Sequence, residues 1–194
     1  MIRVDIPQAE IDDVISKLTT AGSKVPFELR KAVNDAAKQT RNQIARKTKQ
    51  RYQSKKYNTN TVKSLMKIDK STVSDLSATI KSEGSLNEIK EFKVSNLDPT
   101  ARPPFISAKV LKNSSMTPLV SGKIKAFAVR FRSGHVAIVT KYPNIRHNGN
   151  AKIRKLMSPA LPQMVGKTYE EENIDTAHIL HESLDKTVAK LFAE

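Results

Sequence analysis

Hydrophobic positions in the first quarter of the chain follow a helical period. Between residues 8 and 21 the apolar side chains Ile11, Val14, Ile15 and Leu18 have the spacing of one face of a short amphipathic helix. From Phe27 to about Gln53 neither Gly nor Pro occurs, and small or apolar residues again recur three and four positions apart. The pattern predicts a short helix and then a long one, which together form an N-terminal helical arm over residues 1–56.

The period changes to two in the middle of the chain, between residues 63 and 140. Apolar and polar residues alternate around Ile80, and again in two runs between Phe127 and Val139. These two runs flank Arg132-Ser133-Gly134-His135, which predicts a hairpin over 126–139 with Ser133-Gly134 at its turn, because Gly tolerates the positive φ of a tight turn. The whole region is expected to form antiparallel sheet.

In the remaining segments, turn residues predict loops and one further apolar pattern predicts a helix. Three prolines predict a loop over 96–104, Pro118 and Gly122 mark a turn, and low apolar content predicts a second loop over 144–152. Thr168 followed by Glu171 fits a capping box that opens a last helix over 168–194.

Together the elements predict an α+β fold. The chain has 194 residues, an ordinary size for a single domain spanning 1–194. We expect an antiparallel sheet of about four or five strands, packed by the long N-terminal helix and the C-terminal helix. The N-terminal residues lack the apolar core of a signal peptide, and no stretch is apolar over the roughly 18 residues that a membrane span needs. A soluble protein made in the cytoplasm is therefore expected, with no membrane partner.

The charge is strongly positive and unevenly distributed. The 34 Lys and Arg residues exceed the 19 acids and give a net charge of +15. Ten Lys and Arg residues and one acid lie between Arg30 and Lys56, whereas residues 168–194 hold seven acids and two lysines. Contact with a nucleic-acid backbone or an acidic protein is expected, against the alternative of solvated charge. The candidate contacts are Arg41, Arg46, Lys49, Arg51, Arg130 and Arg132. For Arg130 and Arg132, protection of a strand edge against aggregation, or a subunit contact, is favoured over a DNA-facing role.

Catalytic and metal-binding patterns are weak. The absence of cysteine excludes disulfides, thiol nucleophiles and iron–sulfur clusters. His178, His181 and Glu182 share a helical face but lack the order of a helical zinc motif. Asp75, Glu88 and Lys90 only loosely imitate the metal centre of a nuclease. No phosphate-binding loop, nucleophile elbow or dinucleotide motif occurs. We therefore expect a protein that is not an enzyme, without cofactor, metal or small-molecule substrate.

The hairpin and the segment after it resemble the phage minor tail protein Z family. In that family an aromatic and basic hairpin that turns at Ser-Gly-His is followed by a Gly-Pro-Ser-x-Pro-Gln-like segment and a closing helix. Here the hairpin 126–139 is followed by Ser158-Pro159-Ala160-Leu161-Pro162-Gln163, which keeps both prolines and the glutamine. The motifs cover about residues 126–166, and the order of elements is similar over nearly the whole chain.

The resemblance implies a structural role in virion assembly. Members of the family complete the head-proximal end of the tail and join it to the head connector, without enzymatic activity. Relatives in this role form a ring of six through which the genome passes. The expected partners are therefore the tail terminator or tail tube protein, the head connector proteins, further copies of this chain and, loosely, genomic DNA. The expected location is the head–tail junction of the virion of a bacteriophage or prophage. A basic accessory DNA-binding protein is the main alternative, followed by a metal-dependent nuclease that uses Asp75, Glu88 and Lys90.

Overall fold

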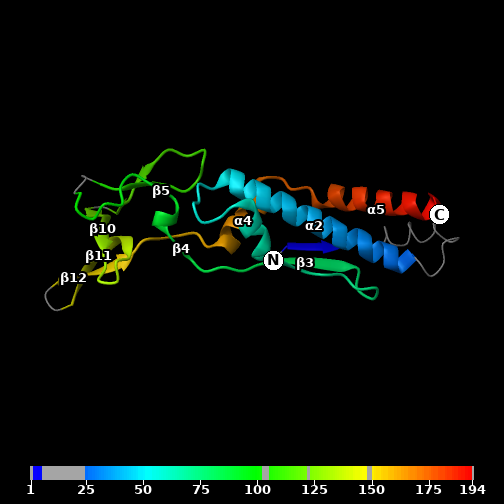
Figure 1. Ribbon diagram of the computed structural model, residues 1–194, viewed down its shortest axis with the longest axis horizontal. Helices are drawn as coiled ribbons and strands as arrows, with labels where there is room; N and C mark the ends of the chain where they lie inside the picture. Colours follow the sequence, from blue (N-terminus) through cyan, green and yellow to red (C-terminus); the bar gives the residue numbers. More distant parts are fainter. Residues whose placement is uncertain (1, 6–24, 102–104, 122, 148–149, 194) are drawn as a thin grey trace. The chain divides into compact units, whose positions relative to one another are not determined.

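The computed structural model describes residues 2–5, 25–101, 105–121, 123–147 and 150–193 (Figure 1). The chain forms two compact units that alternate along the sequence. The helical unit comprises residues 1–47, 59–83 and 165–194, and the β unit comprises 48–58 and 84–164. The prediction of a single domain stays a prediction. The short helix predicted over 8–21 lies outside the described residues.

The long N-terminal helix is confirmed as α2 (Val25–Arg51). Pro26 lies in its first turn, where the missing N–H costs nothing, and Glu28 near the start and Lys49 and Arg51 near the end suit the helix dipole. Its buried stripe is made mostly of small side chains, which let other elements approach the helix closely; these are Ala32, Val33, Ala36, Ala37 and Ala45.

A small antiparallel sheet belongs to the helical unit. Its strands are β1 (Ile2–Asp5), β2 (Met66–Asp69) and β3 (Ser77–Ser82), in the order β1-β3-β2. Buried Ile80 of β3 pairs with Ile2 on one side and Ile68 on the other. A short helix, α3 (Thr59–Ser64), precedes β2. The β2–β3 connection is attached to α2, because Ser71 donates its backbone N–H to Asn34 Oδ1 at 3.0 Å and its hydroxyl to the Arg30 carbonyl at 3.1 Å.

The C-terminal region forms two helices where one was predicted. They are α4 (Leu161–Glu171) and α5 (Thr176–Ala193). Thr168 is buried inside α4, so the capping-box interpretation is wrong. The break follows from Asn173, whose φ of 45° is left-handed, and from Asp175, whose Oδ1 accepts the His178 N–H at 2.9 Å and caps α5. None of the helices in the described ranges is long and apolar enough to cross a membrane.

The β unit contains short strands joined by turns. They are β4 (Asn87–Glu88), β5 (Lys93–Val94), β6 (Ser107–Lys109), β7 (Thr117–Pro118), β8 (Val120–Ser121), β9 (Ile124–Lys125), β10 (Phe127–Arg130), β11 (Val136–His147), β12 (Asn150–Lys155) and β13 (Met157–Ser158), with the 3₁₀ helix η2 (Ile89–Glu91) after β4. Their sheet orders are β5-β6-β7, β8-β9, β13-β4 and β10-β11-β12. A buried core of Ile89, Ile106, Ala108, Ala126 and Ile138 lies beneath them.

The strand pairs of the described residues are antiparallel, so the α+β class is confirmed. The strands divide into five small sheets, where a single sheet of four or five strands was expected. The reason is the shortness of the apolar runs, which turn residues interrupt after two or three positions. Pro118, predicted in a turn, ends β7 opposite Ser107. Residues 96–101 of the predicted loop carry neither strand nor helix, as expected.

The predicted hairpin is present with its turn at the expected place. Phe127 pairs with Val139 and Arg130 with Val136, which leaves residues 131–135 as the connection. Gly134 has a φ of 80°, and its N–H donates to the Phe131 carbonyl at 2.9 Å. Phe131 in turn donates its N–H to the His135 carbonyl at 2.8 Å. The left-handed conformation explains why Gly occupies this position.

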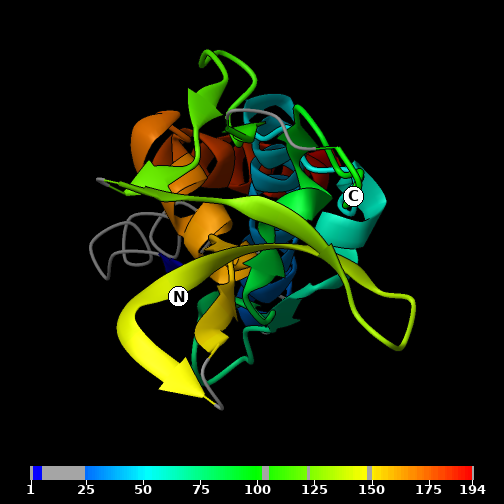
Figure 2. The same ribbon diagram turned by 90° about the vertical axis from the view of Figure 1, so that its left-hand side faces the viewer.

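The predicted loop over 144–152 is wrong, because β11 continues to His147 and β12 begins at Asn150. Beyond the part that pairs with β10, these strands form a two-stranded ribbon, with an irregularity between Lys141 and Arg146. Figure 2 shows the ribbon bending, as a bulged strand does. Its strands are held by backbone pairing and by Tyr142, whose ring lies 5.6 Å from Lys152 Nζ and 5.4 Å from Arg154 Cζ. A low apolar content therefore did not indicate a loop here.

Candidate functional site

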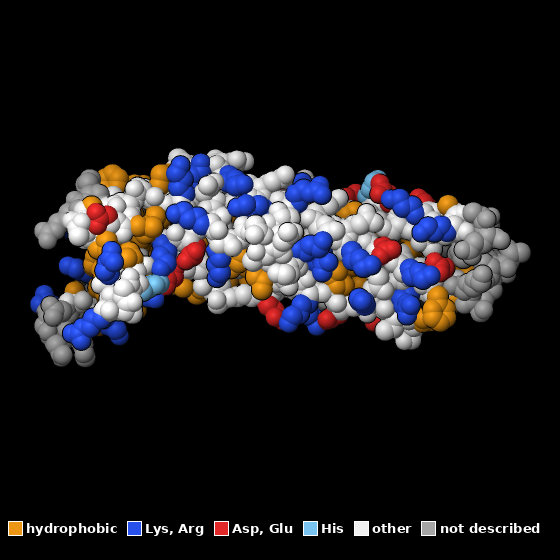
Figure 3. All heavy atoms as spheres, in the orientation of Figure 1, with side chains coloured by type: hydrophobic (Ala, Val, Ile, Leu, Met, Phe, Trp, Pro, Cys, Tyr) orange, Lys and Arg blue, Asp and Glu red, His pale blue; other side chains and the backbone are white. Residues whose placement is uncertain are grey.

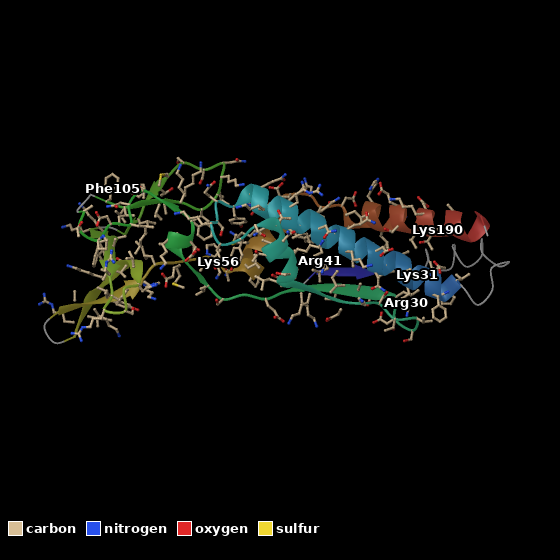
Figure 4. All side chains as sticks on the ribbon, in the orientation of Figure 1. Arg30, Lys31, Arg41, Lys56, Phe105 and Lys190 are labelled. Carbon is tan, nitrogen blue, oxygen red and sulfur yellow. The ribbon has the colours of Figure 1, made fainter. Side chains whose placement is uncertain are left out.

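The four candidate cations of α2 fall into two groups. Arg41 and Arg46 belong to the helical unit, where Arg46 is exposed and Arg41 half-buried (Figure 4). Lys49 and Arg51 belong to the β unit. Lys49 donates to the Ser54 carbonyl at 3.1 Å, and the Arg51 guanidinium lies 5.8 Å from the Tyr52 ring centre. The latter two therefore contribute to the structure of the segment that follows the helix.

Arg130 and Arg132 are exposed at the end of the hairpin. The charge of Arg130 reaches the carboxyl group of Asp98, in the loop after β5. The pKa of Asp98 is lowered most by the hydrogen bonds that Thr100 donates from its backbone N–H and its side chain. The positive charge of Arg130 lowers this pKa further, by a smaller amount. Both arginines remain available for an external partner.

The residues weighed for metal chemistry occupy different places. Asp75 lies in the helical unit, where its Oδ1 accepts the Ser77 N–H at 3.1 Å and holds the turn before β3. Glu88 and Lys90 lie together in the β unit, with 3.4 Å between Oε2 and Nζ. His178 Nδ1 is 3.8 Å from Glu182 Oε1 on the exposed face of α5. Within the part of the chain that the structure describes, no three His, Asp or Glu side chains are arranged to hold a metal.

Glu88 is the centre of an ion-pair cluster that anchors the hairpin turn. Its carboxylate lies 2.9 Å from Lys155 Nζ and 3.0 Å from His135 Nε2, and its side chain is only 20% exposed. Lys90 adds a hydrogen bond of 2.7 Å to the Val136 carbonyl. His135 and Lys155 were not predicted as members of this cluster, because only the pairing of distant strands brings them to Glu88.

The cluster changes the acidity of Glu88. Its partial burial acts to raise the pKa, but the hydrogen bond from Lys155 and the charges of Lys90 and His135 outweigh burial and hold the pKa of Glu88 below its ordinary value. The folded state therefore favours the ionised carboxylate. The resulting stability is present at neutral pH and is lost as the pH falls through the lowered pKa.

We expect Glu88→Gln to lower the free energy of unfolding by about 1–2 kcal/mol at pH 7, because two or three charge-assisted contacts are lost. The difference between wild type and variant should shrink below about pH 4, where the native carboxyl group also becomes protonated. Urea unfolding at pH 7 and at pH 3 measures both values. Glu91→Gln, next to the cluster, is the control. A difference that is independent of pH contradicts the assignment.

The β unit also contains an open cleft of about 540 Å³. It is lined by β9, β10 and the β11–β12 ribbon. Its basic side chains are Lys123, Lys125, Lys141 and Arg146, and the aromatic rings of Phe127 and Tyr142 contribute to its wall. Lys141 Nζ lies 6.0 Å from the centre of the Phe127 ring. This cleft was not predicted, since its residues converge only through the ribbon, part of which was predicted as the loop 144–152.

No family model matches this chain, and no curated protein or solved structure matches it significantly. Its function is therefore argued from the residues and the geometry of the two units.

Proposed function

We propose that this chain is a structural protein of a long-tailed phage or prophage that completes the head-proximal end of the tail and joins the tail to the head connector. The observation that carries the proposal is the hairpin β10–β11, which turns at Ser133-Gly134-His135 and is followed by Pro159 just before α4 and by Pro162 in the first turn of α4. The order of a long helix, small antiparallel sheets, this hairpin and C-terminal helices is the order that the resemblance implies.

Exposed apolar side chains on the β unit support an assembly role. Phe105 is 46% exposed and Val120 is 49% exposed, and Ile153 and Met157 are exposed as well (Figure 4 labels Phe105). Large apolar side chains in contact with water are suited to burial against neighbouring protein surfaces. We propose that these side chains pack against other copies in a ring of six and against the tail and connector proteins on either side.

The charge distribution is compatible with this role. On the face shown in Figure 3, Lys and Arg side chains are spread over the whole surface, the β10–β12 segment included. In the helical unit, Lys47 forms an ion pair with Glu172 at 3.5 Å. This ion pair joins α2 to the acidic C-terminal region of the same chain. A basic accessory DNA-binding protein is the second candidate, and the cationic cleft is the observation that favours it.

The experiment is electron microscopy of lysates from a phage that carries this gene and from its deletion mutant. We expect the deletion to yield DNA-filled heads beside unattached tails with unfinished ends. A plasmid copy of the gene should restore joined virions, and a plasmid with a stop codon early in the gene should not. Normal joined virions in the deletion lysate would rule out the assembly role and favour the accessory DNA-binding protein.

A further inference from the structure

The cleft of the β unit concentrates positive charge without an opposing acid. The basic side chains Lys123, Lys125, Lys141 and Arg146 line it, and no acidic side chain of the described residues does. None of these four cations forms an ion pair with a described acid. Elsewhere in the described chain cations do pair with acids, as in Lys31–Glu28, Lys38–Asp35, Lys67–Glu83, Lys81–Asp69 and Lys186–Glu182. The cleft therefore has uncompensated charge that a bound anion would neutralise.

We propose that this cleft binds the phosphate backbone of DNA, with Lys123, Lys125, Lys141 and Arg146 as the phosphate contacts. This inference rests on the proposed function. It adds the surface at which the chain would contact the passing genome. Binding of DNA by the isolated protein can nevertheless be measured without any virion.

The backbone pairing places the four cations on both sides of the cleft. Lys125 in β9 pairs with Val120, and Lys123 immediately precedes this strand. Lys141 and Arg146 are both on β11, on either side of the irregularity in its pairing with β12. Three of the cations thus stand on strands, which position them better than a loop would, and Lys123 lies in the turn before β9. Lys141 and Arg146 are exposed to solvent.

Aromatic rings between the cations suit a sugar or a base beside the phosphates. Phe127 and Tyr142 are half-buried in the wall of the cleft. The Tyr142 ring forms cation–π contacts with Lys152 and Arg154, both of which are exposed on β12. A positively charged groove with interleaved aromatic side chains is a common arrangement for binding single-stranded nucleic acid without sequence preference. Beside a duplex, whose bases are stacked on one another, the rings are placed to contact the sugars.

A long polyanion fits this surface better than a short acidic peptide segment. The exposed cations Lys152 and Arg154 continue the positive charge along the ribbon beyond the cleft lining. Among the described residues that line the cleft there is no Asn or Gln to read base edges. Lys and Arg contacts to phosphates position a duplex without carrying sequence information. Such contacts allow DNA to slide, which suits a genome in transit.

The test measures binding of the full-length protein to a fluorescein-labelled 20-base-pair duplex by fluorescence anisotropy between 50 and 200 mM NaCl. We expect the variant K123Q/K125Q/K141Q/R146Q to lower the affinity about tenfold or more at 100 mM NaCl, and to reduce the salt slope by about two to four, since each lost phosphate contact removes nearly one released counterion. The charge-preserving variant K123R/K125R/K141R, which leaves Arg146 in place, should bind as wild type does.

The matched control removes four exposed cations outside the cleft, in the variant K55Q/K70Q/K167Q/K190Q. It has the same net charge as the cleft variant, and its affinity should fall by only about two- to threefold. Circular dichroism and thermal unfolding confirm that both variants fold. Equal losses in the two variants, or no binding by wild type at 50 mM NaCl, overturn the proposal. Tighter binding of a poly-glutamate peptide than of the duplex overturns it in favour of an acidic protein partner.

The two proposals fail in different experiments. Joined virions in the deletion lysate, together with cleft-dependent DNA binding by the purified protein, would overturn the assembly role and leave the DNA site in place. Separated heads and tails, together with a protein that does not bind the duplex, would overturn the DNA site alone.

Discussion

Replacing Phe92 by alanine should lower the free energy of unfolding by about 3–5 kcal/mol, a large part of the 5–15 kcal/mol that stabilises a typical domain. Phe92 is the largest of the fully buried side chains, with 0% of its surface exposed, and follows η2 in the β unit. Its removal leaves a cavity that the surrounding strands can fill only in part. Chemical unfolding followed by circular dichroism measures the difference.

Phe105 provides the matched control for this prediction. It belongs to the same unit, but 46% of its side chain is exposed, so that Phe105→Ala should change stability by less than about 1 kcal/mol. Phe92→Leu should fall between the two, since most of the buried volume is kept. Equal effects of Phe92→Ala and Phe105→Ala would show that Phe92 is not a core residue.

Asn87→Ala should cost about 2–4 kcal/mol, because a single side chain satisfies several polar groups in the β unit. Asn87 is 2% exposed. Its Nδ2 donates to the Pro159 carbonyl at 2.9 Å, and its Oδ1 accepts from the Tyr57 hydroxyl at 2.8 Å and from Lys56 Nζ at 3.3 Å. Truncation leaves the buried Tyr57 hydroxyl without this acceptor and the Pro159 carbonyl without this donor. Urea unfolding at neutral pH measures the loss.

A double-mutant cycle tests whether the Asn87–Tyr57 contact carries this cost. Tyr57→Phe alone should cost about 1–2 kcal/mol, and the double variant should cost clearly less than the sum of the two single variants. Asn113→Ala, at an exposed position, should have little effect. Strict additivity of Asn87→Ala and Tyr57→Phe would contradict the assignment of the hydrogen bond.

Local patterns predicted the elements whose determinants are local. The helix α2 follows from an uninterrupted run of helix-compatible residues with a small-residue stripe, and the hairpin follows from two alternating runs around Ser133-Gly134. Both predictions are confirmed because the backbone conformation is decided within a few residues. The contact of α2 with α5, where Gln39 donates to Ser183 at 3.1 Å, joins residues far apart in the sequence and was not predicted.

Elements that depend on distant partners were not predictable in this way. The polar strand β12 has no alternation of its own and is held by its register with β11, which pairs Lys141 with Ile153. Thr168 satisfies a capping box by spacing alone, yet α4 already begins at Leu161. The cluster around Glu88 unites residues separated by up to 67 positions in the sequence. The cationic cleft depends on the same ribbon and was missed for the same reason.

The alternation of the two units along the chain has a consequence for protein synthesis. A ribosome completes the β unit at Met164, whereas the helical unit still lacks α5, which lies in the segment 165–194. The helix α2 therefore waits for α5 to be synthesised before Ser183 can meet Gln39. A nonsense mutation after Met164 should leave the apolar stripe of α2 uncovered and direct the nascent product to chaperones and proteases.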